Sequence, residues 1–289
     1  MDKLIINGGR KLKGEVTVSG SKNASLPICI AAALAPGAST ITNVPRLRDI
    51  TTTAKLLESL GATIERHENT MRIDAGTINT VEATYDLVKT MRASVLVLGP
   101  LLARFAKKGL KGARINFDVS TVGGTEHLMM AAAIAKGESI LENAAREPEI
   151  ADLADYLNRM GARIEGAGTD TIRIQGVHEL TPAAYEVMPD RIEAGTFMCA
   201  AAITGGDVKI NGMKLEHLDA LTFKLMDAGV EVTNRNGVVR VKGPKRPQSV
   251  NIKTRPYPGF ATDMQAQFMA LMCVAEGASV ISENIFENR

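Results

Sequence analysis

Residues 31–43 read AAALAPGASTITN, and nearly the same string returns as AAAIAKGESILEN at 131–143 and as AAAITGGDVKING at 200–212. A fourth copy, LMCVAEGASVISEN, occupies residues 271–284. Each copy joins an alanine-rich apolar run to a glycine and then to an alternating, strand-like run. Self-similarity of this kind indicates a repeat architecture, so we expect a chain built from copies of one supersecondary unit.

A second landmark follows the first three copies, as LLESLGATIE, YLNRMGARIE and LMDAGVEVT. Its glycine predicts a helix C-cap and lies 24, 24 and 23 residues after the first glycine, in the pairs Gly37–Gly61, Gly137–Gly161 and Gly206–Gly229. Strings such as TDTIRIQG and RNGVVRVKG then predict hairpins. One unit is therefore strand, helix, strand, helix and hairpin, which predicts an α/β (α+β) fold with mixed sheets.

The spacing between units is not constant. Successive copies lie 69 and 71 residues apart from Gly137 to Gly206 and on to Gly277, but 100 residues separate Gly37 from Gly137. Two units would need about 140, so roughly 40 residues are missing from the second unit, which the spacing truncates near 105–113. One helix over 85–105 is predicted for what remains of it, and the pattern ends within the fifth unit. We therefore expect an incomplete relative of a longer repeat protein.

A length of 289 residues suits two domains. The repeat count divides near residue 184, which predicts a first domain over 21–184 and a partial second domain over 185–289. Residues 1–20 are predicted to pack with the second domain. Incomplete units leave apolar helix faces and sheet edges uncovered, so we expect self-association or repacking around residues 105–113.

The composition excludes several functional classes. A net charge of +2 with interspersed signs gives no electrostatic footprint for nucleic acid or an anionic membrane, and no apolar run reaches the ~18–20 residues of a membrane span. Cys29, Cys199 and Cys273 lie in apolar helical runs without CxxC spacing. They are predicted to be buried, inert thiols in a reducing cytoplasm, with no structural metal.

Polar residues stand where the first strand-like run gives way to a helix, in VSGSKNASLP. A helix N-terminus has unpaired N–H groups and partial positive charge, and Lys22 beside it would complete an anion site. The alternative is a solvated lysine, with Ser21 or Asn23 as an ordinary N-cap.

Several longer strings carry a family resemblance, namely GSKNASLP, YDLVKTMRAS, ENAAREPEI, GTDTIRI, PDRIEAGTF, RPYPGFATDMQAQ and IFENR. Together they resemble the UDP-N-acetylglucosamine branch of the enolpyruvyl transferases along nearly the whole chain. The resemblance implies an enolpyruvyl-transferase-like two-domain repeat fold. It also implies transfer of enolpyruvate from phosphoenolpyruvate to the 3-hydroxyl of UDP-N-acetylglucosamine, without metal or cofactor, as the first committed step of peptidoglycan synthesis in the cytoplasm.

The resemblance assigns substrate contacts in the first domain. Lys22 would hold the phosphate of phosphoenolpyruvate, Asn23 the sugar, and Arg92 a ligand in the cleft. Residues Thr121, Val122 and Gly123 match the loop that meets the nucleotide. Arg92 has a second interpretation, an arginine whose stem packs on an exposed helical stripe while its head stays in water.

The second domain supplies further candidates. Asp263 would be the base that takes the proton from the sugar hydroxyl, although an acid in a first helical turn also complements the helix dipole. The resemblance places Ile285 and Phe286 at the substrate and Arg289 at the carboxylate of phosphoenolpyruvate. Arg191 and Glu193 match a hinge between the domains, with a surface salt bridge as the alternative.

Two departures from the family bear on activity. Val119 follows Asp118 where the family has lysine, and the family's Pro-Gly-Gly-Cys lid with its following arginine has no counterpart in the sequence. The missing string would fall within the roughly 40 absent residues. We therefore expect an enolpyruvyl transferase with low or no turnover. The alternatives are a UDP-sugar-binding module or inactive relative, and a repeat scaffold that recruits another chain.

Overall fold

The computed structural model describes residues 3, 5–83, 88–89 and 92–287 of the chain. It contains two compact units, which we call the central unit (Ser19–Met188) and the terminal unit (Met1–Val18 with Pro189–Arg289). The chain therefore passes between units twice, after Val18 and after Met188. No helix in the described ranges is long and apolar enough to cross a membrane.

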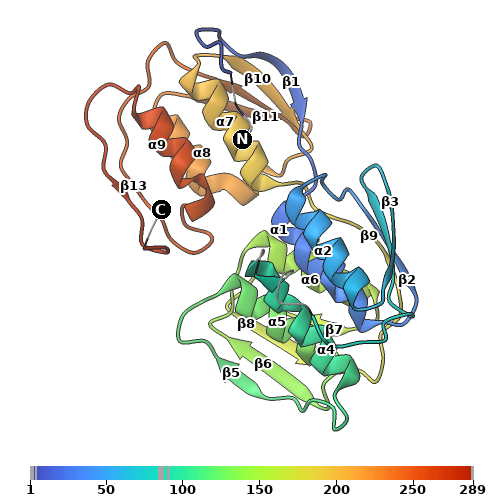
Figure 1. The fold of residues 1–289 in the computed structure, drawn as a ribbon. Coiled ribbons are helices and arrows are strands. Elements are labelled where there is room, and N and C mark those ends of the chain that lie inside the picture. The colour runs from blue at the N-terminus through green and yellow to red at the C-terminus, as the bar shows by residue number, and fades with distance from the viewer. Residues whose placement is uncertain (1–2, 4, 84–87, 90–91, 288–289) are drawn as a thin grey trace. The chain divides into compact units, whose positions relative to one another are not determined.

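The central unit packs its helices between two four-stranded sheets, ordered β3-β4-β2-β9 and β5-β6-β8-β7 (Figure 1). Its helical elements are α1 (Lys22–Ala31), η1 (Ala32–Leu34), α2 (Arg48–Ser59), η2 (Arg92–Val97), α4 (Leu98–Phe105), α5 (Val122–Ala132) and α6 (Pro148–Arg159). Its strands are β2 (Ala38–Thr42), β3 (Thr63–His67), β4 (Thr70–Asp74), β5 (Arg114–Asn116), β6 (Glu138–Glu142), β7 (Arg163–Glu165), β8 (Thr171–Gln175) and β9 (Ala184–Glu186).

The terminal unit has one four-stranded sheet, ordered β1-β10-β12-β11, with helices on one face, and a separate strand pair, β13-β14 (Figure 1). Its helical elements are α7 (Arg191–Ile203), η3 (Leu215–Leu218), α8 (Asp219–Asp227), η4 (Thr262–Met264) and α9 (Gln265–Met272). Its strands are β1 (Lys13–Thr17), β10 (Asp207–Asn211), β11 (Glu231–Arg235), β12 (Val238–Lys242), β13 (Ile252–Lys253) and β14 (Ile281–Ser282).

The three four-stranded sheets share one topology. In each, a hairpin joins a central strand antiparallel, and an edge strand joins the same central strand parallel from the other side. The parallel edge strand is β5 beside β6, β9 beside β2, and β1 beside β10. This equivalence confirms the predicted repeat and the mixed α/β fold. In two of the sheets the edge strand comes from a distant part of the chain, so those sheets are complete only when remote segments pair.

The first helix of the first repeat, α1, is buried nearly all round, which explains its bland sequence. Every residue of α1 from Ala24 to Ala31 is buried, in a core shared with α2 and α6. A helix that is apolar on all sides has no solvent face to carry polar residues. The charged and amide side chains of α1 are therefore confined to its start, at Lys22 and Asn23, and the Ser25 hydroxyl is buried.

Hairpin chemistry follows the sequence closely. Asn236 and Gly237 link β11 to β12 and both have positive φ, +52° and +79°. Two consecutive residues of positive φ form the turn that matches the twist of a two-residue hairpin, and Asn-Gly is the dipeptide that adopts it most readily. The two glycines after α7 differ in conformation and surroundings. Gly205, with φ +59°, has the left-handed conformation after α7, while the backbone of Gly206 packs against the carbonyl of Leu12.

The single helix predicted over 85–105 is wrong in its described part. Residues Arg92–Val97 form the 3₁₀ helix η2, and the α-helix α4 begins only at Leu98. Pro100 gives the reason, because its ring would clash with the carbonyl of residue 96 and it has no N–H to donate to an α-helix running through from there. Residues 84–87 and 90–91 lie outside the described residues.

The prediction of three buried cysteines is wrong for one of them. Cys29 and Cys199 are buried, and burial raises the pKa of each thiol to about 12. Cys273 is exposed at the C-cap of α9. It shares an exposed stripe with Met269 and Val274, at 41% and 44% exposure. The run is apolar enough for a core helix, but no described residue covers this face.

Candidate active site

Several predicted site residues, Lys22, Thr121 and Arg191 among them, occupy equivalent places in the repeats, at the start of a first helix. Ser21 caps α1, Thr121 caps α5 and Asp190 caps α7, in each case by accepting a backbone N–H in the first helical turn. Side-chain caps fix where a helix begins and leave neighbouring N–H groups directed outward. The repeat therefore places several helix N-termini, which attract anions, beside the candidate residues.

Lys22 is the first residue of α1 because Ser21 precedes it. The Ser21 hydroxyl, 1% exposed, accepts from the Ala24 N–H at 3.2 Å. The Lys22 ammonium lies 3.6 Å from a carboxylate oxygen of Asp49 in the first turn of α2, and both side chains are about half exposed. Asn23 follows, half-buried. An anion here would meet a lysine whose position is already set by a carboxylate.

The start of α5 repeats the same bonding pattern one hundred residues later. Thr121 accepts from the Gly124 N–H at 3.4 Å, and the Thr125 hydroxyl donates to the Thr121 carbonyl at 2.8 Å. In α1 the Ser25 hydroxyl donates to the Ser21 carbonyl at 2.7 Å. Gly123 is exposed, and a Cβ built on it would meet nothing within 4 Å. The exposed backbone there is open to a ligand.

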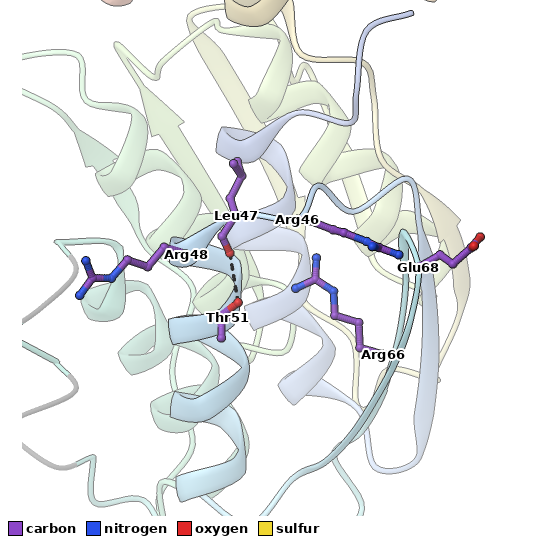
Figure 2. A pocket seen from close by; sticks show the side chains of 6 residues that line it. All are labelled: Arg46, Leu47, Arg48, Thr51, Arg66 and Glu68. Atoms are coloured by element: carbon purple, nitrogen blue, oxygen red, sulfur yellow. Dashed lines mark hydrogen bonds between the residues drawn. The ribbon is translucent and has the colours of Figure 1, made fainter. Parts of the chain in front are cut away.

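An arginine-rich hollow of about 490 Å³ opens at the start of α2 (Figure 2). Its lining is Arg46, Leu47, Arg48, Thr51, Arg66 and Glu68. Arg66 donates to the Pro45 carbonyl at 2.8 Å. In Figure 2 the guanidinium groups of Arg46 and Arg66 lie on one side of Leu47, whereas Arg48 extends to the other. Cations outnumber the single carboxylate, so this surface attracts anions toward the helix that carries Asp49.

Buried carboxyl groups lie behind the start of α5. Glu126 is 4% exposed and Glu149, in the first turn of α6, is 2% exposed. Burial raises the pKa of Glu126 well above its usual range, and the charges of Glu149 and Glu147 raise it further. Like charges in a desolvated site favour the protonated form of one partner. This cluster can hold a proton close to the start of α5.

In the terminal unit, the carboxylate of Glu283 brings the predicted site residues together. One oxygen accepts from the Thr262 hydroxyl at 2.9 Å, and Thr262 precedes Asp263 in η4. The other accepts from the backbone N–H groups of Ile285 at 2.8 Å and Phe286 at 3.2 Å. One side chain therefore links the residue before the predicted base to the predicted substrate loop.

Arg191 and Tyr257 line a hollow of about 50 Å³ in the terminal unit. The Arg191 guanidinium carbon lies 5.7 Å from the centre of the Tyr257 ring, within cation–π range. Arg191 is 9% exposed, which does not fit the surface salt bridge weighed for it from the sequence. Glu193 is in the first turn of α7. Ala261 and Met264, on either side of Asp263, complete the wall nearest the predicted base.

Two predicted residues cannot be placed in this geometry. Arg289 lies outside the described residues, and of Arg92 only the backbone is described, at the start of η2. Three residues that sequence reasoning missed are prominent, namely Asp49, Glu126 and Glu283. A glutamate within the apolar run EHLMMAAA was the available signal for Glu126. For Asp49 and Glu283 no local pattern reveals a partner in a separate element.

The repeat topology matches the fold of solved enolpyruvyl transferases. The enolpyruvyl transferase NikO from Streptomyces tendae superposes with a TM-score of 0.87 at 22% identity, over 98% of this chain and 78% of that one. EPSP synthase from Acinetobacter baumannii gives 0.70 at 21% identity, over 96% and 75%.

The chain belongs to the EPSP synthase (3-phosphoshikimate 1-carboxyvinyltransferase) family, whose sequence profile matches residues 6–112 and 107–289. Two relatives are each named UDP-N-acetylglucosamine 1-carboxyvinyltransferase. The one from Trichlorobacter lovleyi is 85% identical over 331 aligned positions, and the one from Geobacter metallireducens is 67% identical over 330. Both alignments cover 100% of this chain and 79% of the relative.

The alignment with the first relative is longer than the chain itself. It spans 331 positions against 289 residues, a difference of 42, so the relative has at least that many positions without a counterpart here. The two profile segments meet at residues 107–112. That junction coincides with the place where the repeat spacing predicts about 40 missing residues.

Proposed function

We propose that this chain is an enolpyruvyl transferase that moves the enolpyruvyl group of phosphoenolpyruvate to the 3-hydroxyl of UDP-N-acetylglucosamine and releases phosphate. The observation that carries the proposal is 85% identity, along the whole chain, to a relative named for this sugar-nucleotide reaction. The product would enter peptidoglycan synthesis, with consequences for cell shape and division, and the reaction would take place in the cytoplasm.

We propose that each unit supplies its own share of the substrate contacts. In the central unit, Lys22 and the start of α1 would hold the phosphate, Asn23 the sugar, and Arg92 with residues 121–123 the remaining nucleotide contacts. In the terminal unit, Asp263 would act with Ile285, Phe286 and Arg289. Helix N-termini at equivalent repeat positions support this assignment, because anionic substrates are stabilised there. The domains 21–184 and 185–289, the latter with residues 1–20, would be the functional divisions.

The chemistry requires three proton transfers, the formation of one carbon–oxygen bond and the cleavage of another. Asp263 would take the proton from the sugar 3-hydroxyl as that oxygen attacks the central carbon of phosphoenolpyruvate, whose methylene carbon is protonated by an acid. The tetrahedral intermediate then loses phosphate, and the methyl carbon gives up a proton to restore the double bond. Lys22 would stabilise the charge of the departing phosphate.

We further propose that turnover by this chain is low or absent. The lid cysteine and anion-binding arginine of the family would lie among the positions that the relative has and this chain lacks. Removing one well-placed electrostatic donor costs about 10²–10³ in rate, so losing several would leave little catalysis. The second candidate is therefore a UDP-sugar-binding module that keeps the helix-start contacts without the chemistry.

One calorimetric series separates these functions. UDP-N-acetylglucosamine is titrated into the protein, followed by phosphoenolpyruvate, and phosphate release is measured in parallel. Sugar-nucleotide binding without phosphate favours the binding module. Phosphate release at a rate typical of the family would overturn the proposed low turnover, and absence of sugar-nucleotide binding would overturn both functions.

Self-association is proposed for a separate surface. Exposed apolar side chains follow one stripe of η2 and α4, at Val95, Leu98, Leu102 and Phe105, with exposures of 59%, 47%, 42% and 37%. The stripe ends next to the junction at 107–112. Contiguous apolar surface of this kind favours association, so sedimentation should show a concentration-dependent dimer that Leu98→Gln with Leu102→Gln weakens. A monomer at all concentrations would contradict it.

A further inference from the structure

The Glu283 side chain binds donors from three separate segments of the terminal unit. Besides Thr262 and the N–H groups of Ile285 and Phe286, it accepts from the Thr254 hydroxyl at 2.9 Å. Thr254, which is 0% exposed, also accepts from the Asn284 N–H at 2.9 Å. Three of these donors share one carboxylate oxygen and the Thr262 hydroxyl binds the other, so all four bonds depend on this one side chain.

The Glu283 carboxylate makes its contacts just beyond the point where the backbone pairing of β13 with β14 ends. Strands β13 and β14 are parallel for only two residue pairs, Ile252 with Ile281 and Lys253 with Ser282. A last backbone bond runs from the Thr254 N–H to the Ser282 carbonyl at 2.9 Å. Beyond Ser282 the sheet no longer fixes the chain, and the Glu283 side chain makes the next contacts that join this segment to Thr254 and η4.

The bonding favours an ionised Glu283. Partial burial alone would raise the pKa of this carboxyl, but hydrogen bonds from the Ile285 N–H, Thr254, the Phe286 N–H and Thr262 outweigh burial and lower it. Bonds between a charged acceptor and neutral donors are stronger than neutral pairs. The arrangement is therefore held by charge-assisted bonds at neutral pH.

We propose that Glu283 is a positioning residue that holds Ile285 and Phe286 in register with Thr262 and Asp263. This inference deepens the proposed function and rests on it, since Asp263 and the 285–289 segment are its substrate groups. Glu283 itself would touch no reacting atom. It would set the separation between the base and the segment that contacts the sugar nucleotide, two elements about twenty residues apart in the sequence.

The test compares Glu283→Ala and Glu283→Gln with Glu276→Gln. Glu276 is an exposed glutamate four residues after the end of α9, so its variant removes the same charge from the same unit without touching these bonds. The glutamine keeps one carbonyl acceptor for the Ile285 and Phe286 N–H groups, and its amide can donate to the Thr262 hydroxyl. It should therefore rescue most of the arrangement that alanine destroys.

Amide hydrogen exchange of the full chain gives a readout that needs no activity. We expect exchange at Ile285 and Phe286 to rise at least tenfold in Glu283→Ala, by a few-fold at most in Glu283→Gln, and not at all in Glu276→Gln, while exchange in α7 and β12 stays the same. Unchanged exchange at Ile285 and Phe286 in the alanine variant would overturn the proposal, and so would an equal rise throughout the unit.

Calorimetric titration of UDP-N-acetylglucosamine then tests the link to the substrate. We expect about tenfold weaker binding in Glu283→Ala, the scale of one lost charge-assisted hydrogen bond, with near-complete recovery in Glu283→Gln. Wild-type affinity in the alanine variant would overturn the positioning role. If the wild-type chain does not bind the sugar nucleotide, the proposed function fails, and the exchange experiment still decides whether Glu283 orders the segment.

Discussion

The Lys22 ammonium lies 3.6 Å from the Asp49 carboxylate, so the first turns of α1 and α2 meet through opposite charges. Each helix start has unpaired N–H groups that favour an anion, and Asp49 is the anion that the protein itself supplies. Both side chains are more than 40% exposed, so the pair is weak and solvent-screened. A phosphate could displace Asp49 from Lys22 at little cost.

Replacing Lys22 should therefore weaken the binding of phosphoenolpyruvate while leaving the free energy of unfolding nearly unchanged. We expect Lys22→Ala to weaken phosphoenolpyruvate binding, measured by calorimetry with UDP-N-acetylglucosamine present, by roughly 10–100-fold, the value of a charged hydrogen bond. The free energy of unfolding should change by less than about 1 kcal/mol. Asp49→Asn should bind phosphoenolpyruvate as well as wild type or better. Lys55→Ala, an exposed lysine of α2, is the control. Wild-type affinity in Lys22→Ala would contradict the phosphate assignment.

The two equivalent caps in the central unit should differ in strength. Ser21 is 1% exposed and caps at 3.2 Å, whereas Thr121 is exposed and caps at 3.4 Å. We expect Ser21→Ala to lower the free energy of unfolding by about 1–2 kcal/mol and Thr121→Ala by about 0.5–1 kcal/mol. Urea unfolding followed on the central unit measures both. Equal losses, or a larger loss at Thr121, would show that burial does not set the value of these caps.

Cysteine labelling should distinguish Cys273 from the other two. Burial raises the pKa of Cys29 and Cys199 to about 12, so at pH 8 only about one in 10⁴ of either thiol is ionised. We expect a maleimide to modify one thiol per native chain, none in Cys273→Ser, and all three after denaturation. Rapid loss of two or three native thiols would mean that the cores around Cys29 or Cys199 open on the labelling timescale.

The sequence predicted the repeat because each repeat carries its own local signals. The alanine-rich run and the capping glycine recur within short windows, the Asn236–Gly237 turn is equally local, and local windows are what propensity and pattern describe. The same logic placed Lys22 at a helix start, since Ser21 is a capping residue type. These parts of the fold and site depend on neighbours within a few positions.

Partners contributed by other elements could not be predicted in this way. Lys22 meets Asp49 across two helices, and Glu283 reaches back to Thr254 and Thr262 over 29 and 21 positions. The exposure of a side chain could not be predicted from the sequence for the same reason. Cys273 lies in a run as apolar as that of Cys29, but burial depends on what packs against the helix rather than on its own sequence.

Asp152 leads to a final prediction, on the pH dependence of stability. Its carboxylate accepts from the Tyr185 hydroxyl at 2.8 Å and from the Met188 N–H at 3.1 Å, next to the chain's passage out of the central unit. Burial raises the pKa of Asp152 to about 6, the two hydrogen bonds oppose that rise, and the charges of Asp155 and Glu149 add to it. The folded state therefore binds this proton more tightly than the unfolded state does.

Because the pKa is raised on folding, ionisation of Asp152 removes stability as the pH rises from about 4 to about 6. A pKa shift of about two units corresponds to roughly 3 kcal/mol in the free energy of unfolding.

We expect Asp152→Asn, whose oxygen can still accept from the Met188 N–H while its amide donates to Tyr185, to gain stability relative to wild type between pH 4 and pH 6. Asp155→Asn, an exposed carboxyl on the same helix, should show a much smaller change. Urea unfolding at pH 4, 5, 6 and 7 measures the difference. A difference between Asp152→Asn and wild type that stays constant over this range would mean that Asp152 has the same proton affinity in both states, and that its contacts with Tyr185 and Met188 offset the whole cost of burying its charge.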